Sequence, residues 1–264
     1  MNKLLRANFA RLWKNRPFLV GLAFMFLAGS AYVLKAIPAN QGTYQIPVSL
    51  ESTFFTYAML IGVLSAIFCS LFLGVEYGDG TMRNKIIAGH KRTDIYLSNL
   101  ITNLSASLLM CLSYILSNVV LGIPLLGFQK ASLSDILLLI SGSCVTVAAL
   151  CSVFTMISLL IQNKALAPIV CIVGMFLMLG AVSEIKRMLD QPEYYYDNVK
   201  NKNYLDGEIR EKFEFCYNFL PAGQEMQYAA MKTENIGGMC LYSLGITAVT
   251  TGIGTFFFRK KDIK

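Results

Sequence analysis

Six long apolar runs constrain this chain more than any other feature of its sequence, because each can cross a lipid bilayer as a helix. An α-helix rises about 1.5 Å per residue and needs roughly 20 residues to cross a hydrocarbon core of about 30 Å. Lys35 is the one charged residue inside the runs, and its ammonium can reach the interface from there. The pattern predicts an all-α integral membrane protein with six transmembrane helices in one domain. The runs cover residues 18–37, 54–75, 100–126, 136–161, 165–183 and 239–258.

The composition excludes the main structural alternative, a water-soluble α/β enzyme with buried strands. Hydrophobic residues make up 55% of the 264 residues and charged residues 15%, and the mean hydropathy is +0.53. Such an enzyme would interrupt its apolar runs with turn residues every 4 to 8 residues or so, and these runs are unbroken. A membrane domain therefore fits the sequence far better.

Lysine and arginine residues predict the orientation of the chain. Fourteen of them lie in the two ends of the chain and in two connecting segments on the same side, against Lys35 and Lys130 in the opposite short segments. Positively charged segments resist translocation, so both termini are expected in the cytoplasm, with residues 259–264 as a basic tail. The net charge of +7 is then explained by the orientation of the chain in the membrane, and no nucleic-acid partner is expected.

A long external loop, residues 184–238, is expected between the fifth and sixth helices. It contains ten acidic and seven basic residues. Its aromatic residues, among them Phe213, Phe215 and Phe219, suit amphipathic helices on the outer interface or a small folded cap. Anchoring at the interface is favoured over contact with a departing peptide or lipid.

Residues 1–17 are expected to form an amphipathic helix on the cytoplasmic membrane surface. Its apolar side would carry Leu5, Phe9, Leu12 and Trp13, and basic residues would occupy the other side. A surface anchor is favoured over direct binding of a partner, although one helix can do both.

The cytoplasmic segment after the second run predicts a short helix at residues 82–88. Thr81 is the expected N-cap, and Gly89 is expected to end the helix in a left-handed conformation. Met82, Ile86 and Ile87 would then form an exposed apolar side. This exposed apolar side could bind in the groove of a soluble partner, or the helix could simply lie on the membrane.

The same segment resembles the signature that follows the second span of ABC-2 type permeases, the membrane subunits of ABC exporters. The resemblance rests on Glu76-Tyr77-x-x-Gly80-Thr81-x-Arg83-Asn84-Lys85, on Arg92 and Tyr96-Leu97, on Asn218-Phe219-Leu220-Pro221-Ala222-Gly223-Gln224, and on the ending Phe256-Phe257-Phe258-Arg259-Lys260-Lys261. Within that superfamily the chain looks most like the bacitracin and lantibiotic immunity permeases of Gram-positive bacteria. Its external loop is longer than the compact hairpin that is common in such exporters.

The resemblance implies a plasma-membrane subunit that moves a hydrophobic or amphiphilic substrate, such as an antimicrobial peptide, out of the cell or membrane. Two copies of a separate ABC ATP-binding subunit would bind ATP and Mg²⁺, and a second permease chain, identical or different, would complete the transporter. This chain would be non-catalytic and bind no cofactor or metal itself. The residues that the resemblance implies for coupling to the ATPase are Glu76, Tyr77, Thr81, Met82, Arg83, Lys85, Ile86 and Ile87.

Catalytic motifs are absent from the sequence, which agrees with a non-catalytic subunit. The chain has no GxxxxGK[ST] run to cradle ATP phosphates and no HExxH motif. Its single histidine, His90, lies in a basic turn where exposure to solvent is expected.

Hydroxyl and amide side chains in the apolar runs mark a tentative substrate pathway, although helix packing is the favoured interpretation of them. The expected helix interior holds no charge, which argues against an inorganic ion as cargo and leaves peptide, lipid and drug open. Two other functions stay possible: a peptide-sensing or immunity protein without transport, and a membrane enzyme acting on lipid or peptide. The pathway candidates are Asn103, Ser107, Asn118, Thr146 and Thr155.

Overall fold

The computed structural model describes residues 1–41, 49–128, 131–194, 199–233 and 235–262, and these residues form helices and loops without a strand. Parts of the predicted external loop (195–198 and 234), of the predicted tail (263–264) and the basic residue Lys130 lie outside the described residues. Six helices are long and apolar enough to cross a membrane, which confirms the predicted multi-pass, all-helical architecture.

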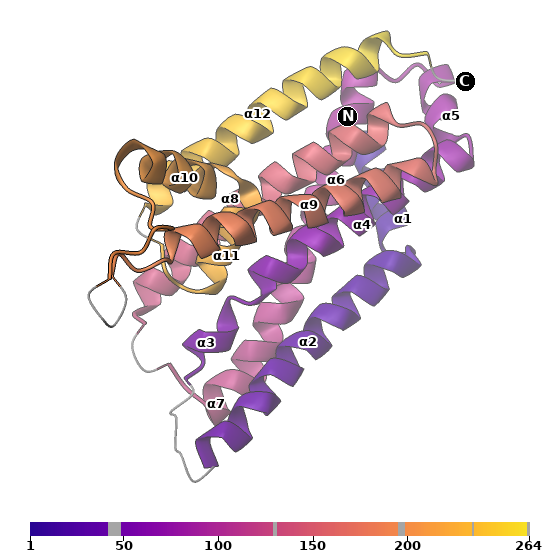
Figure 1. The fold of residues 1–264 in the computed structure, drawn as a ribbon. Coiled ribbons are helices and arrows are strands. Elements are labelled where there is room, and N and C mark those ends of the chain that lie inside the picture. The colour runs from indigo at the N-terminus through magenta and orange to yellow at the C-terminus, as the bar shows by residue number, and fades with distance from the viewer. Residues whose placement is uncertain (42–48, 129–130, 195–198, 234, 263–264) are drawn as a thin grey trace.

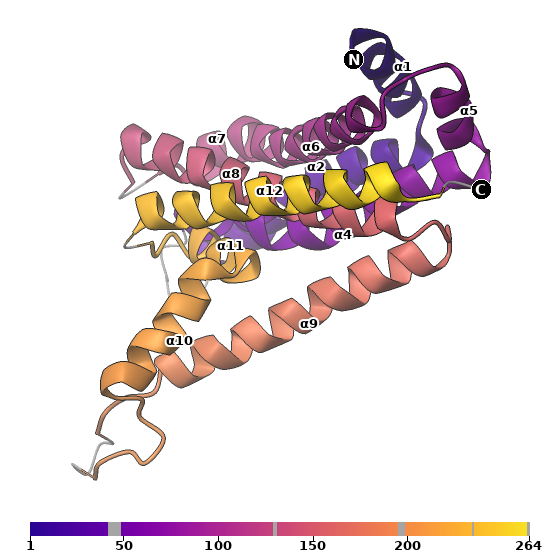
Figure 2. The same ribbon diagram turned by 90° about the horizontal axis from the view of Figure 1, so that it is seen from above.

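The six long helices run lengthwise through one bundle (Figures 1 and 2). In the order of the chain they are α2 (Arg16–Gln41), α4 (Tyr57–Gly78), α6 (Arg92–Ser117), α8 (Leu133–Leu160), α9 (Leu166–Leu189) and α12 (Ile236–Lys260). Shorter helices lie at the ends of the bundle: α1 (Asn2–Leu12), α3 (Glu51–Phe54), α5 (Thr81–Ile87), α7 (Ile123–Leu125), α10 (Gly207–Phe219) and α11 (Pro221–Ala229).

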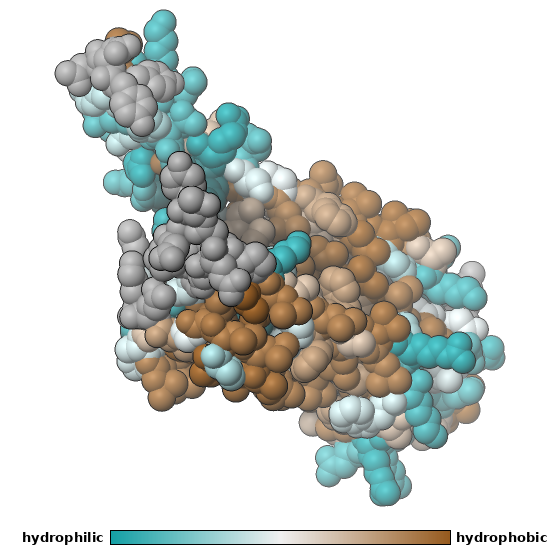
Figure 3. All heavy atoms as spheres, turned by 90° about the horizontal axis from the view of Figure 1, so that it is seen from below, coloured by the Kyte–Doolittle hydropathy of each residue, from teal (hydrophilic) through white to brown (hydrophobic). Residues whose placement is uncertain are grey.

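Helices α4 and α8 form the centre of the bundle. Helix α8 packs against α4, α6, α9 and α12, and more than half of the apolar window in both α4 and α8 is buried. In α2, α9 and α12 the buried share is 28%, 22% and 11%, so these helices present most of their apolar side chains outward. The resulting brown surface covers the middle of the bundle, and polar residues gather at its two ends (Figure 3). This is the surface that a hydrocarbon solvent requires.

The third predicted span differs from the observed helix. Helix α6 begins at Arg92, eight residues before the predicted start, and α-helical geometry stops at Ser117. A π-helical segment, η1 (Asn118–Gly122), follows it. The side-chain amide of Asn118 donates a hydrogen bond to the carbonyl of Tyr114 (3.1 Å), which also accepts from the backbone N–H of Asn118. Hydropathy does not detect such a local change of helical geometry.

The segment predicted as an external loop contains α10 and α11, and only α10 projects from the bundle (Figure 2). Helix α11 begins at Pro221 and packs against α4, α8 and α9. Gly223 makes the tight turn between α10 and α11 possible, because a Cβ atom there would overlap the carbonyl oxygen of Tyr217. The prediction of amphipathic helices on the outer interface or a small folded cap therefore does not describe α11, which packs into the bundle.

Gln224 fixes α11 in the bundle with four hydrogen bonds. Its side-chain oxygen accepts from the hydroxyls of Thr146 on α8 and Ser243 on α12, both at 2.6 Å. Its amide donates to the carbonyls of Asn218 (2.9 Å) and Met239 (3.2 Å). The buried amide thus has all of its polar groups satisfied while it joins three helices.

The contact between α2 and α6 requires a small residue at Gly29. A Cβ atom there would overlap Ser117 Oγ and lie 3.1 Å from the carbonyl oxygen of Tyr114. We expect Gly29→Ala to destabilise the protein by about 1–3 kcal/mol, because the backbones must separate. Gly174→Ala is the matched control in α9, where a Cβ atom meets nothing within 4 Å. Thermal unfolding of both variants in detergent checks this, and equal effects would contradict the proposed close contact.

Candidate coupling site

A short helix at one end of the bundle, α5, is the element to which the sequence pointed. It lies at the same end as α1 and the C-terminal end of α12 (Figure 2). Gly80 (φ +66°) and Gly89 (φ +81°) flank it in the left-handed region, which side chains disfavour. The prediction for Gly89 is confirmed. Helix α5 starts one residue earlier than predicted and its N-cap is Gly80, not Thr81, whose hydroxyl instead donates to the carbonyl of Glu76 (3.1 Å).

The carboxylate of Glu76, at the end of α4, joins four helices at this site. Its Oε1 atom lies 2.6 Å from Nη1 of Arg11 on α1 and also pairs with Nζ of Lys85 on α5. Its Oε2 atom accepts a hydrogen bond from Asn99 on α6 (3.2 Å). Glu76 is fully buried, so these partners replace the water that the carboxylate has lost.

A second layer of hydrogen bonds holds the partners of Glu76 in place. The amide of Asn8 on α1 donates to Asn99 (2.9 Å), and its oxygen accepts from Lys85 (2.9 Å). The guanidinium carbon of Arg11 lies 3.8 Å from the ring centre of Phe72, a cation–π arrangement. We call Asn8, Arg11, Glu76, Lys85 and Asn99 the Glu76 cluster.

The electrostatics of the Glu76 cluster balance one acid against two bases. Burial lowers the pKa of the Arg11 guanidinium and the pKa of the Lys85 ammonium, because both charged groups lose water. The negative charge of Glu76 opposes this effect on both pKa values. The carboxylate is therefore the group that keeps two cations charged in a mostly dry site.

Most of the apolar side of α5 faces the protein, so the prediction that this side is exposed is wrong for Met82 and Ile86. Met82 is buried, and Ile86 packs against the same group of side chains. These belong to every helix around the site: Leu4, Leu73, Ile95, Tyr96, Leu100, Leu159 and Phe258. The reason is geometric, since α5 folds back beneath α4 and α6 and its apolar side meets theirs instead of solvent.

The surface that α5 offers to a partner is different from the one predicted. Arg83, Asn84 and Ala88 are exposed, and Ile87 exposes 72% of its surface. Of the eight predicted coupling residues, Arg83 and Ile87 lie on this outer surface. Glu76 and Met82 are inside, Lys85 is paired with Glu76, and the Tyr77 hydroxyl donates to the carbonyl of Leu159 (2.7 Å).

Asn8, Arg11 and Asn99 belong to the cluster, and sequence reasoning missed all three. The predicted apolar side of α1 included Trp13, which is 57% exposed. Helix α1 instead buries Leu4, Asn8 and Leu12, which are spaced four residues apart. The spacing of Asn8 four residues from both Leu4 and Leu12, which places it on the same side of the helix, is the signal that could have revealed the cluster.

The five pathway candidates are all fully buried within this one chain, and they do not meet at one place. Asn103 donates to Thr155 (2.9 Å), and Ser107 accepts from Ser65 (2.9 Å). Thr146 binds Gln224, and Asn118 bonds within its own helix. Three of the four contacts join different helices, which agrees with the favoured helix-packing interpretation.

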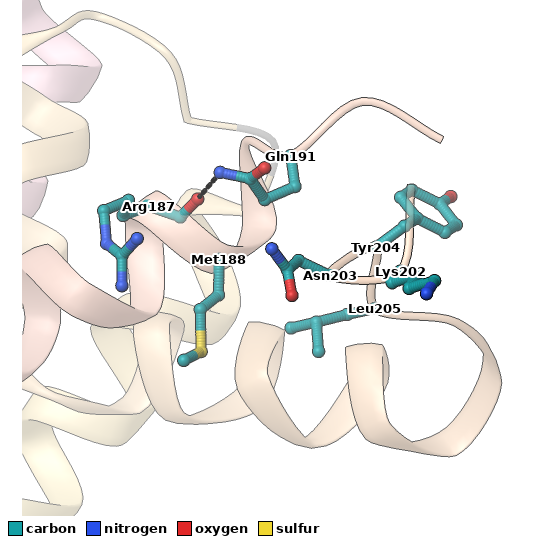
Figure 4. Close-up of a pocket in the computed structure, with 7 residues that line it drawn as sticks. All are labelled: Arg187, Met188, Gln191, Lys202, Asn203, Tyr204 and Leu205. Atoms are coloured by element: carbon teal, nitrogen blue, oxygen red, sulfur yellow. Dashed lines mark hydrogen bonds between the residues drawn. The ribbon is translucent and has the colours of Figure 1, made fainter. Parts of the chain in front are cut away.

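A cavity of about 320 Å³ lies at the far end of the molecule from α5. It forms where the end of α9 meets the segment before α10, and Gln191 bonds the carbonyl of Arg187 across one side of it (3.2 Å, Figure 4). Arg187 also pairs with Glu184. The described part of the chain contains no group of three His, Cys, Asp or Glu residues placed to hold a metal.

Comparison of the chain with protein-family models finds no match, and comparison with curated proteins finds none either.

Glu76→Gln should destabilise the protein by up to about 3 kcal/mol, because it leaves two half-buried cations without their counter-ion. Adding Lys85→Met should recover part of this loss, since it removes one of those cations. Chemical or thermal unfolding of the purified protein in detergent measures both effects.

Glu214→Gln on α10 is the matched control for this prediction. Glu214 pairs with Arg210 (2.9 Å) but is 48% exposed, so its loss should change stability by no more than about 0.5 kcal/mol. Equal effects of the two substitutions would contradict a special role for the Glu76 cluster.

Proposed function

We propose that this chain is the permease subunit of an ATP-driven exporter of the ABC-2 type. The observation that carries the proposal is that one side of α5 is bound to the bundle while the other side is exposed. Its inner side is fixed to α1, α4 and α6 through the Glu76 cluster, while Arg83 and Ile87 face outward. A rigid element of this kind can receive a push from a soluble subunit and pass it to three helices at once. The sequence signature at residues 76–85 is the second support.

The proposed assembly has two ATP-binding subunits beneath two permease chains, which are identical or different. ATP and Mg²⁺ bind to the partner subunits, since this chain lacks the motif that cradles phosphates. In this proposal α5, α1 and both termini are cytoplasmic, with the exposed Lys3, Arg6 and Lys14 of the N-terminal segment near anionic head groups. The setting is the plasma membrane of a Gram-positive bacterium.

The proposed cargo is a hydrophobic or amphiphilic molecule, with an antimicrobial peptide as the first candidate. Since the five pathway candidates are buried among the helices of a single chain, the path for the cargo would run along an outer face of the bundle where a second permease chain packs. The exposed apolar surfaces of α2, α9 and α12 supply such faces.

Ile87→Asp should abolish binding of the ATP-binding subunit and the ATPase activity of the complex, because it places a charge on the exposed apolar contact. Arg83→Glu should weaken both by reversing a charge beside it. The measurement is co-purification from membranes followed by an ATPase assay.

The control for this experiment is Ile209→Asp on α10, where Ile209 is 56% exposed at the other end of the protein. It should leave the complex and its ATPase activity intact. A chain that purifies alone and hydrolyses no ATP, with or without these changes, would instead favour a peptide-sensing or immunity protein.

The proposed orientation predicts the labelling of cysteines in intact cells. Cys216 on α10 is exposed, and the other six cysteines are buried or half-buried. A membrane-impermeant maleimide should therefore label the wild-type protein from outside and fail to label Cys216→Ser. In the Cys216→Ser background, Asn84→Cys should react only after the membrane is permeabilised. Reaction of Asn84→Cys in intact cells would contradict the orientation.

A further inference from the structure

Glu225 on α11 is a buried acid to which neither the sequence nor the proposed function assigns a role. Its side chain is only 1% exposed, and neither carboxylate oxygen has a hydrogen-bond partner in the described part of the chain. The sequence predicted a helix interior without charge and gave no sign of this buried acid, because α11 lies outside the six apolar runs and still packs among α4, α8 and α9.

The space around Glu225 exists because Gly62 on α4 has no side chain. A Cβ atom on Gly62 would lie 2.6 Å from Oε2 of Glu225 and 3.0 Å from Oε1, and it would overlap Cε of Met175 on α9. The carboxyl group is thus held between the backbone of one helix and an apolar side chain of another. Neither neighbour can replace the hydrogen bonds of water, so a charged carboxylate is strongly disfavoured here.

Glu225 forms no ion pair with any of the residues that the structure describes. In the buried parts of the helices around α11, the titratable side chains are tyrosines and cysteines, which are neutral at physiological pH. The acid on α4, Glu76, lies about 21 Å from Gly62 along the helix axis. The charged residues of α8, α9 and α10 lie at exposed positions or at helix ends. The neutral titratable groups are Tyr57 and Cys69 on α4, Cys111 on α6, Cys144 and Cys151 on α8, Cys171 on α9, Tyr217 on α10 and Tyr228 on α11.

We propose that Glu225 is a proton-binding site that couples the pH at this end of the bundle to the packing of α11. The carboxylic acid keeps its proton while α11 is packed against Gly62 and Met175. When α11 moves outward, water reaches the group, the O–H bond breaks, and the proton passes to solvent. A proton is the ligand that fits, because a metal ion needs several oxygen ligands and the surroundings offer a glycine backbone and a thioether methyl group.

The direction of the pH effect follows from proton linkage. Burial raises the pKa of Glu225 well above its ordinary value in the packed state. The packed state therefore holds a proton that the open state releases, and packing weakens as pH rises above the ordinary glutamate range. Acidic solvent at this end keeps α11 in place, and alkaline solvent favours its release. The effect is fully present below the ordinary glutamate pKa and is lost as pH passes through the raised value.

Infrared difference spectroscopy tests the protonation state directly. The spectrum of the detergent-purified wild-type protein at neutral pH, minus that of Glu225→Gln, should show the C=O stretching band of a protonated carboxylic acid, and the band should shift when glutamate is labelled with ¹³C. Absence of this band at neutral pH overturns the proposal. Glu225→Met is the second variant, because a thioether of similar size tolerates burial if the glutamine variant fails to fold.

Amide hydrogen exchange tests the coupling to α11. In the wild-type protein, after correction for the intrinsic pH dependence, the opening equilibrium of α11 should rise up to about tenfold per pH unit as pH increases above the ordinary glutamate range. Glu225→Met should remove this dependence, while Glu214→Gln on the exposed face of α10 should retain it. A slope that is equal in the wild-type and Glu225→Met proteins overturns the proposal, even if the infrared band is present. Both tests use the chain alone, so their outcome is independent of any ATP-binding partner.

Discussion

The ion pairs of Glu76 are the interaction on which the cytoplasmic end of the proposed exporter depends. One carboxylate holds Arg11 and Lys85 and accepts a hydrogen bond from Asn99, so α1, α4, α5 and α6 meet at a single group. Each of these side chains alone would carry a large desolvation cost at this depth, and together they share it. The cluster therefore fixes the position of α5 more tightly than its seven residues could by themselves. A force applied to the exposed side of α5 would reach the long helices through this group.

Glu76 and Glu225, the two glutamates that are buried in the described part of the chain, meet the same physical constraint in two ways. The interior of the protein offers no water, so a buried acid must be paired or neutral. Glu76 is paired, since two cations and an amide surround it. Glu225 has no such partners and sits against a glycine and a methionine, which favours the neutral acid. The ion pairs of Glu76 hold their helices together permanently, whereas the packing of α11 at Glu225 depends on pH in our proposal.

Hydropathy predicted the six long helices because transmembrane length and apolar composition are properties of a continuous segment. It could not predict which side of a short helix meets another helix. Helix α1 turned Asn8 inward and Trp13 outward, and α5 turned Met82 inward, because their partners lie on other helices. Helix α11 was missed for a related reason: its polar sequence suits a surface, but the space at Gly62, the bonds of Gln224 and the burial of Ala222 and Tyr228 hold it in the bundle. Glu76 and Lys85 of the candidate coupling site were thus predictable, while Asn8, Arg11 and Asn99 depended on contacts between different helices.

Photocrosslinking from position 84 in native membranes is the most direct test of the central claim that α5 transmits force from an ATPase. Asn84 is exposed on α5 between Arg83 and Ile87, so a photoreactive residue there samples the proposed docking surface without disturbing the Glu76 cluster. The account predicts one dominant adduct, a P-loop ATP-binding subunit, whose yield changes when ATP is added. Adducts with lipid alone, or a protein adduct that ignores ATP, would contradict it.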